Sequence, residues 1–229
     1  MKRIVSIQDI SCFGKCSLTV ALPIISAMGI EACPVPTAVL STHTGGFTGY
    51  TYRDLTNDIP SIADHLKSLD LKFDAVATGY LGSFEQIKIV SDFFDKFKTD
   101  DNLIIVDPVM GDKGHFYAGF TEDFALEMKK LCSKADVIVP NLTEAAQLLD
   151  EDYIDGGYDE EYIKNLLIRL SNLGSKIVVL TGVSFDDNLQ GVMSYNRETG
   201  EFSSYFNENI PGYFQYRRYF FKHLVRCIG

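Results

Sequence analysis

Two aspartates flank a tight turn near the middle of the chain. Asp107 and Asp112 begin and end the segment Asp-Pro-Val-Met-Gly-Asp, which follows the apolar run 103–106. An apolar, β-branched run that ends at Asp-Pro is typical of a buried parallel strand, and ligands of open α/β sheets bind where such strands end. Because Mg²⁺ is usually held by one or two carboxylates and by phosphate oxygens, this stretch predicts a site for magnesium and a polyphosphate. A solvated turn in which an aspartate caps a helix is the alternative.

The composition narrows the class of protein. With 229 residues the chain is long enough for one sizeable α/β domain, and its net charge of −10 argues against nucleic acid or an anionic membrane as the main partner. No apolar run is long enough to span a membrane, and no secretory segment precedes the first predicted strand. The five cysteines are an odd number without zinc-ribbon spacing, so we expect free thiols and a cytoplasmic protein.

Strand patterns alternate with helical patterns along most of the chain. The predicted strands are 4–8, 32–40, 75–78, 103–106, 136–140 and 176–181. The predicted helices are 15–28, 59–69, 84–97, 122–131, 143–149 and 162–173. The runs 191–195 and 202–206 predict a hairpin. This alternation indicates an α/β fold of three layers, in which helices cover both faces of a central, mostly parallel sheet.

Polar or Gly-rich loops follow five of the predicted strands, namely 9–15, 41–49, 79–82, 141–144 and 181–182. One edge of a parallel sheet would collect these loops together with Asp107 and Asp112. Each loop alone has an ordinary explanation, since a Gly-rich loop is often a plain turn and Asn141 with Glu144 fits a helix capping box. Together they predict a cleft for a nucleotide and a metal, without a Walker loop or a dinucleotide fingerprint.

Five short motifs occur in a recognisable order: Ser-Ile-Gln at 6–8, Ser-Thr-His-Thr-Gly at 41–45, Thr-Gly-Tyr-Leu-Gly at 78–82, Asp-Pro-Val-Met-Gly-Asp at 107–112 and Pro-Asn-Leu-Thr-Glu at 140–144. Over roughly residues 2–214 the chain resembles the pyridoxal kinases of the ribokinase-like superfamily. The resemblance implies a ribokinase-like fold, a homodimer, and transfer of phosphate from ATP, with Mg²⁺, to the 5′-hydroxymethyl group of pyridoxal, pyridoxine or pyridoxamine.

The resemblance also implies roles for residues at matching positions. Thr44 and Tyr80 are expected to contact the pyridine ring, and Asp9 stands where many members have a serine that touches the substrate. This difference leaves open a hydroxymethylpyrimidine kinase of thiamine synthesis, which has the same fold. A remnant that binds ligand without turnover is a further alternative.

On the nucleotide side, the resemblance implies two overlapping sets of residues. Asp107 and Glu144 are expected around the metal. The ATP contacts are expected at Asp112, Asn141, Glu144 and Thr181. Lys113 and Gly114 are expected in the lid that closes over the two substrates.

The last residues depart from the family. Its Gly-Thr-Gly-Asp motif, whose aspartate is the general base, is expected just after residue 214, but no such motif is present. Residues 215–229 instead carry four Lys or Arg and no Asp or Glu, for which a basic surface helix is the simple explanation. Back-translation from the second base can nevertheless read Thr-Gly-Asp-Ile-Phe-Ser-Ser-Thr-Leu-Ser-Gly-Ala-Leu. Our hypothesis is an incomplete kinase domain at 1–214 and an aberrant, frameshifted tail at 215–229, with no catalytic aspartate and little or no activity.

Overall fold

The computed structural model describes residues 1–45 and 47–209. The hypothesis about the tail at 215–229 lies outside these residues. The described residues form two compact units, an N-terminal unit of residues 1–105 and a C-terminal unit that begins at Val106. In the described part of the chain, no helix combines the length and the apolar character that crossing a bilayer requires.

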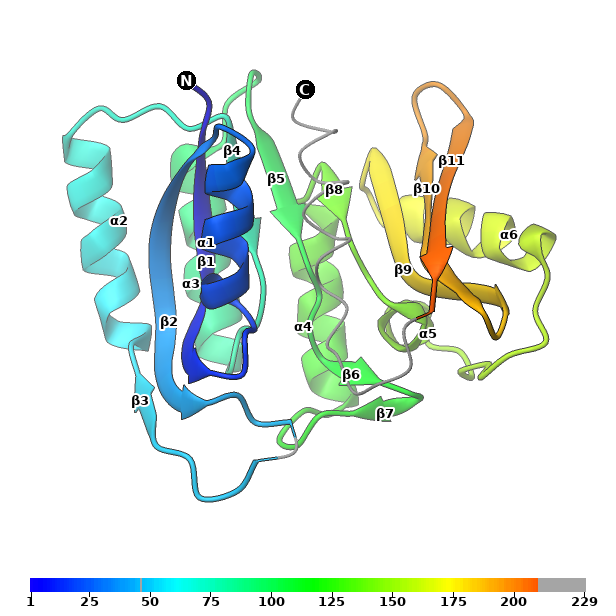
Figure 1. Cartoon of the computed structure of the whole chain (residues 1–229). Coiled ribbons are helices and arrows are strands. Elements are labelled where there is room, and N and C mark those ends of the chain that lie inside the picture. The colour runs from blue at the N-terminus through cyan, green and yellow to red at the C-terminus, as the bar shows by residue number, and fades with distance from the viewer. Residues whose placement is uncertain (46, 210–229) are drawn as a thin grey trace. The chain divides into compact units, whose positions relative to one another are not determined.

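The N-terminal unit is built on a mostly parallel set of strands (Figure 1). The order is β5-β4-β1-β2-β3, and β1 pairs in parallel with both β2 and β4, whereas β3 is antiparallel to β2. The bounds are β1 (Arg3–Phe13), β2 (Glu31–Thr42), β3 (Tyr52–Asp54), β4 (Ala75–Thr78) and β5 (Leu103–Val106). Ile4, Val5 and Ile7 of β1 are almost fully buried, as expected for a central strand with both faces covered.

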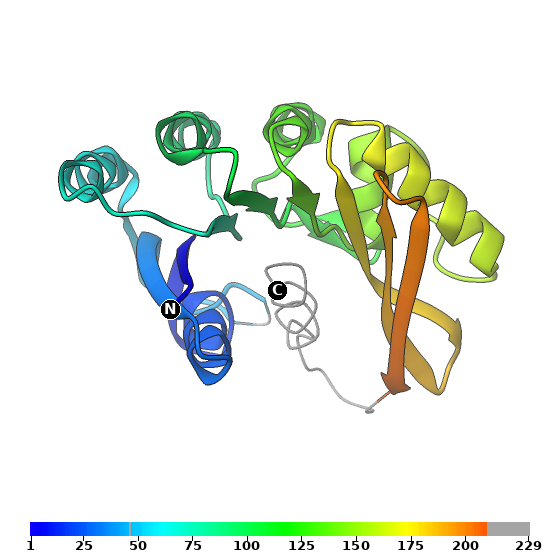
Figure 2. The ribbon, with the colours of Figure 1, turned by 90° about the horizontal axis from the view of Figure 1, so that it is seen from above.

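Helices cover both faces of these strands. Figure 2 shows α1 (Leu18–Ala27) on one face, and α2 (Ile59–Ser68) and α3 (Phe84–Phe97) on the other. A 3₁₀ turn, η1 (Thr56–Asp58), leads into α2. The predicted layers, with helices on both faces, are therefore present in this unit.

Two sequence predictions near the N-terminus are wrong. The first strand was expected to end at residue 8 but continues to Phe13, so Asp9 lies within a strand and not in a loop after it. The first helix was expected from residue 15 but begins at Leu18, because Lys15 and Ser17 adopt left-handed backbone conformations (φ 51° and 50°) that a right-handed helix excludes. The short β3 was not predicted.

The C-terminal unit has strand order β11-β10-β9-β8. The bounds are β8 (Val137–Ile138), β9 (Ile177–Asp186), β10 (Leu189–Asn196) and β11 (Glu201–Glu208). β8 and β9 are parallel, while β10 is antiparallel to β9 and to β11, which confirms the predicted hairpin. β9 extends beyond the predicted end at residue 181 to Asp186, so Thr181 and Gly182 lie within this strand and not in a loop after it.

Three helices complete the C-terminal unit: α4 (Glu122–Ser133), α5 (Leu142–Leu149) and α6 (Glu160–Ser171). α6 packs on β9 and β10, and α5 contacts both α4 and α6. A separate two-stranded hairpin, β6 (Gly111–Asp112) and β7 (His115–Phe116), was not predicted. It forms the link between the Asp107 turn and α4.

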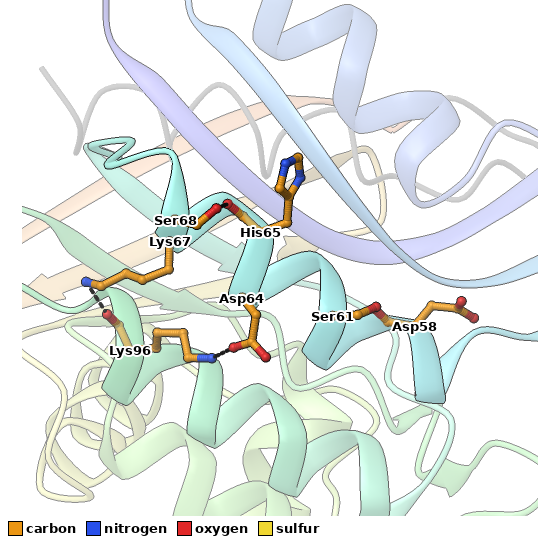
Figure 3. Close-up of polar contacts among 7 residues, drawn as sticks. All are labelled: Asp58, Ser61, Asp64, His65, Lys67, Ser68 and Lys96. Carbon is orange, nitrogen blue, oxygen red and sulfur yellow. Dashed lines mark hydrogen bonds and ion pairs between the residues drawn. The ribbon is translucent and has the colours of Figure 1, made fainter.

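Polar contacts brace α2 against α3 at the surface of the N-terminal unit (Figure 3). The Lys96 ammonium pairs with Asp64 across the two helices, and Lys67 Nζ donates to the Lys96 carbonyl at 2.9 Å. Lys67 Nζ also lies 5.5 Å from the centre of the Phe97 ring. Because Asp64 and Lys67 are exposed, these polar contacts fasten the two helices together without contributing much stability.

Candidate functional site

In the N-terminal unit, Asp9 occupies an irregular position of β1. The register of β1 and β2 shifts there, since Gln8 is opposite Pro36 while Ile10 is opposite Val39. Two residues of β2 therefore stand against Asp9, and such a bulge redirects side chains locally. The Asp9 side chain is buried and accepts a hydrogen bond from Ser11 Oγ at 2.9 Å. A buried carboxylate needs such partners, because desolvation of a charge is unfavourable.

Tyr80 lies in the same neighbourhood as Asp9. The pKa of Tyr80 is raised to about 12, mainly by burial and then, in decreasing order, by the nearby Tyr52, the Asp9 carboxylate and Tyr50. Burial also raises the pKa of Tyr52, with contributions from Asp54, Asp9 and Tyr50. Negative charge near a phenol opposes its ionisation, so these phenols stay protonated and can donate hydrogen bonds.

Gly82 leaves room for two of these phenols. A Cβ atom at this position would lie 3.0 Å from the Tyr52 hydroxyl and 3.5 Å from the Tyr80 hydroxyl. We call Asp9, Tyr50, Tyr52 and Tyr80 the tyrosine cluster. A carboxylate with neighbouring phenols can hydrogen-bond a heteroaromatic ring that carries polar substituents.

Thr44 lies on an exposed turn after β2. The neighbouring His43 anchors this turn, because its Nδ1 accepts a hydrogen bond from the Gly45 N–H at 3.1 Å and its ring meets Phe47 edge-on at 4.9 Å. The structure thus brings Asp9 and Tyr80 together, whereas the ring contact expected for Thr44 stays a prediction.

In the C-terminal unit, the Asp107 turn lies beside the start of α5. The Val139 N–H donates to the Val106 carbonyl at 2.9 Å, so the strand ends that carry Asp107 and Asn141 are neighbours. Glu144 connects them further. Its carboxylate is buried and accepts from the Met110 N–H at 3.2 Å and from the Asn141 N–H at 2.8 Å.

Asn141 and Glu144 form the capping box that the sequence allowed. The Asn141 Oδ1 accepts from the Glu144 N–H at 2.9 Å, and the Glu144 carboxylate in turn accepts from the Asn141 N–H. Both Glu144 oxygens are therefore occupied by backbone N–H groups. This geometry assigns Glu144 a role in shaping the site, and its direct contact with a metal or ATP stays a prediction.

The β6–β7 hairpin is held by the same first turn of α5. Asn141 Nδ2 donates to the Gly111 carbonyl at 2.9 Å, and the Gly114 N–H donates to Thr143 Oγ1 at 2.9 Å. Lys113 and Gly114 form the hairpin turn with φ of 50° and 77°, as a two-residue turn of this hand requires. Asp112 is exposed on this hairpin. Sequence reasoning missed Thr143, although its place two residues after the helix cap was a signal.

Thr181 lies next to Asn141. Its N–H donates to the Pro140 carbonyl at 2.9 Å, and Thr181 and Asn141 form a parallel β-bridge. The four residues predicted to contact ATP thus belong to three adjoining segments: the hairpin, the first turn of α5 and the middle of β9. The prediction of one cleft that joins both sets of residues stays a prediction.

The carboxylates allow a limited metal site. Within residues 1–45 and 47–209, no group of three or more His, Cys, Asp or Glu could hold a metal ion. Asp107 is half-buried. Burial raises the pKa of Cys132, and the nearby charges of Glu144 and Asp107 raise it as well. Mg²⁺ needs only one or two carboxylates when phosphates and water supply the other ligands. Asp107 fits an ion that arrives with a polyphosphate, and Glu144 is the less suitable ligand.

A family profile decides the classification. The profile described as phosphomethylpyrimidine kinase matches residues 21–212. The chain belongs to this kinase family. Pyridoxal kinase PdxY of Vibrio campbellii is 37% identical over 158 residues, which cover 66% of this chain and 54% of the relative. The chain spans about half the length of the curated relatives that it matches.

Solved structures agree with the family. A Bacteroides thetaiotaomicron protein assigned to the phosphomethylpyrimidine kinases is 43% identical with a TM-score of 0.88, over 93% of this chain and 73% of that one. A second crystal form of that protein contains pyridoxal. The pyridoxal kinase of Lactobacillus plantarum is 30% identical with a TM-score of 0.81, over 93% and 74% of the two chains. The predicted ribokinase-like fold, with a mostly parallel sheet and helices, is confirmed.

Proposed function

We propose that this protein uses ATP to phosphorylate the 5′-hydroxymethyl group of pyridoxal, pyridoxine or pyridoxamine. The observation that carries the proposal is the tyrosine cluster around Asp9, in a chain 43% identical to a protein that was crystallised with pyridoxal. The buried carboxylate and the protonated phenols offer both an acceptor and donors to the polar substituents of the pyridine ring. Thr44 is the further ring contact in this proposal.

The C-terminal unit is proposed to bind ATP. Asn141, Thr181 and Asp112 belong to adjoining segments, and Glu144 holds the first turn of α5 against the Asp107 turn. Asp107 would hold Mg²⁺ together with phosphate oxygens and water, with Glu144 close by. When bound, the ion neutralises part of the negative charge of the phosphates. The chain has a net charge of −10, so its overall charge does not supply this positive charge.

Transfer by this chain is proposed to be slow. The 229 residues contain no Gly-Thr-Gly-Asp motif, so the residue that would act as general base is missing. Loss of a general base typically lowers a rate by about 10²–10⁴. The residues proposed to bind the vitamer and ATP are present in the chain, so we expect it to bind both ligands even though transfer is slow.

A hydroxymethylpyrimidine kinase is the second candidate. The description of the matched family and the presence of Asp9 where many pyridoxal kinases have serine favour it. Rates with pyridoxal and with hydroxymethylpyrimidine, measured side by side, separate the two candidates.

The oligomeric state and the cellular compartment follow from the family resemblance in this proposal. We infer a cytoplasmic homodimer, as the family resemblance implies. The four described cysteines, Cys12, Cys16, Cys33 and Cys132, are free thiols, which suits a reducing compartment.

The decisive experiment compares this chain with a version whose reading frame is restored from residue 214 onward. We expect pyridoxal to raise the melting temperature of both proteins and only the restored protein to phosphorylate it. Equal turnover by both would show that another residue supplies the base. No binding by either protein would contradict the proposed substrate.

A further inference from the structure

One buried glutamine connects three segments of the N-terminal unit. Gln86 lies in the first turn of α3 with its side chain almost fully buried. Its Oε1 accepts from the Gly82 N–H at 2.7 Å, and its Nε2 donates to the Thr37 carbonyl at 3.2 Å and to Thr56 Oγ1 at 2.8 Å. The partners belong to the loop before α3, the irregular part of β2 and the turn after β3, so one amide holds together segments that are distant in the sequence.

Each of these segments leads to the tyrosine cluster. Gly82 is two residues after Tyr80 and is the residue whose missing side chain makes room for two phenols. Thr37 lies where β2 bulges against Asp9, and its hydroxyl donates to the Tyr80 carbonyl at 3.4 Å.

The third segment leads to Tyr52. Asp54 Oδ1 accepts hydrogen bonds from the Thr56 hydroxyl and, at 2.7 Å, from the Thr56 N–H, and these two bonds hold the pKa of Asp54 below its usual value. Asp54 ends β3, the short strand that begins at Tyr52. β3 consists of three residues, and all three are exposed. Because so short a strand has few packing contacts of its own, its position depends on hydrogen bonds such as these at its end.

We propose that Gln86 is the positioning residue of the substrate site, which sets the spacing of Tyr52 and Tyr80 around Asp9 and so determines affinity for the pyridine ring. The inference rests on the proposed function. Its physical basis is that a buried amide with satisfied donors and acceptor holds its neighbours rigidly, whereas a buried polar group left unpaired is costly. A Cβ atom added at Gly82 would lie 3.0 Å from the Tyr52 hydroxyl, so the loop that Gln86 holds lies close to this phenol.

The test replaces Gln86 by methionine, which keeps the length of the side chain and removes its hydrogen bonds. The matched control is Asn102→Leu. Asn102 is also buried, donates to the Phe97 carbonyl at 2.8 Å and accepts from the Thr99 N–H at 3.0 Å, but it does so at the other end of α3. Both variants of the full chain are compared by calorimetric titration with pyridoxal and by melting temperature.

We expect both substitutions to lower the melting temperature, and only Gln86→Met to weaken pyridoxal binding, by about tenfold or more. Asn102→Leu should bind within about twofold of the parent chain. Gln86→Glu is the second variant, because it retains an acceptor for the Gly82 N–H but loses both donations, and it should also bind pyridoxal more weakly. Hydrogen exchange at the Gly82 amide should be faster in Gln86→Met and unchanged in Asn102→Leu.

Pyridoxal binding by both Gln86 variants at the affinity of the parent chain would overturn the inference. So would an equal loss of affinity in Asn102→Leu, since Gln86 would then act only through stability. Failure of the parent chain to bind pyridoxal at all would instead overturn the proposed function, so the two failures are distinguishable.

Discussion

The two units hold their candidate residues in different ways. In the C-terminal unit, the short segment 141–144 both caps a helix and fastens the β6–β7 hairpin, through side chains that contact backbone groups. In the N-terminal unit, Asp9, Tyr52 and Tyr80 come from three strands or loops, and one side-chain amide on α3 connects their supports. A substitution within 141–144 should therefore weaken nucleotide binding because it disturbs the start of α5. A substitution of Gln86 should weaken substrate binding because it displaces members of the tyrosine cluster.

The largest effect that would test this contrast is expected at Glu144. Glu144→Ala removes a buried carboxylate and leaves the Met110 and Asn141 N–H groups without their acceptor, so we expect a loss of about 3 kcal/mol in the free energy of unfolding. Denaturant unfolding measures it. The matched control is Glu127→Ala on α4, whose partly exposed side chain pairs with Lys130 and should contribute less than about 0.5 kcal/mol. Equal losses in the two variants would contradict the buried role of Glu144.

A smaller effect is expected at Thr143. Thr143→Val keeps the shape of the side chain but removes the acceptor of the Gly114 N–H, which frees the turn of the hairpin that carries Asp112. We expect weaker binding of a non-hydrolysable ATP analogue, by about tenfold, with pyridoxal binding unchanged. Thr143→Ser should restore affinity because it restores the hydroxyl. If valine and serine behave alike, the hydrogen bond does not position the hairpin.

Tyr80 should affect the stability of the protein in alkaline solution. Its pKa of about 12 in the folded protein is above the ordinary value of 10, so the folded state keeps a proton that the unfolded chain releases. The stability that this shift contributes is complete below about pH 10 and is lost as the pH rises toward 12. The parent chain should therefore lose more stability between pH 10 and 12 than Tyr80→Phe.

Asp9 offers a check on the same tyrosine. Its carboxylate contributes to the raised pKa of Tyr80, so Asp9→Asn should lower that pKa while burial keeps it above 10. Ultraviolet titration of the phenols, with Tyr80→Phe to identify the signal, measures the shift. An unchanged titration curve in Asp9→Asn would show that the Asp9 carboxylate does not raise the pKa of Tyr80, and so would contradict its place in the tyrosine cluster.

The smallest effect is expected outside both sites, at the brace between α2 and α3 (Figure 3). Lys96→Met removes an ion pair with an Asp64 side chain that is 71% exposed, and such pairs typically contribute about 0.2–1 kcal/mol. Unfolding in low and high salt should therefore give nearly equal values for the variant and the parent chain. A loss above about 1 kcal/mol would show that this brace matters as much as the buried contacts of the two sites.

Local signals in the sequence were sufficient for much of the fold. Strand and helix periodicity predicts most elements, Asn141 with Glu144 fits a helix capping box, and the β10–β11 hairpin follows from two runs around a turn. These features depend on residues within a few positions of one another, so their physical cause is written in short stretches of sequence. The five motifs likewise led to the correct kinase family.

The tertiary structure alone decided the arrangement around Asp9. No local pattern showed that β1 continues through Asp9, that β2 bulges against it, or that Gln86 would be the common partner of Thr37 and Thr56. Gln86 and Thr37 are 49 positions apart, and a hydrogen bond over that separation leaves no periodic trace in the sequence. Whether a polar side chain ends in water or in a buried network depends on which elements pack over it, and only the folded chain determines that.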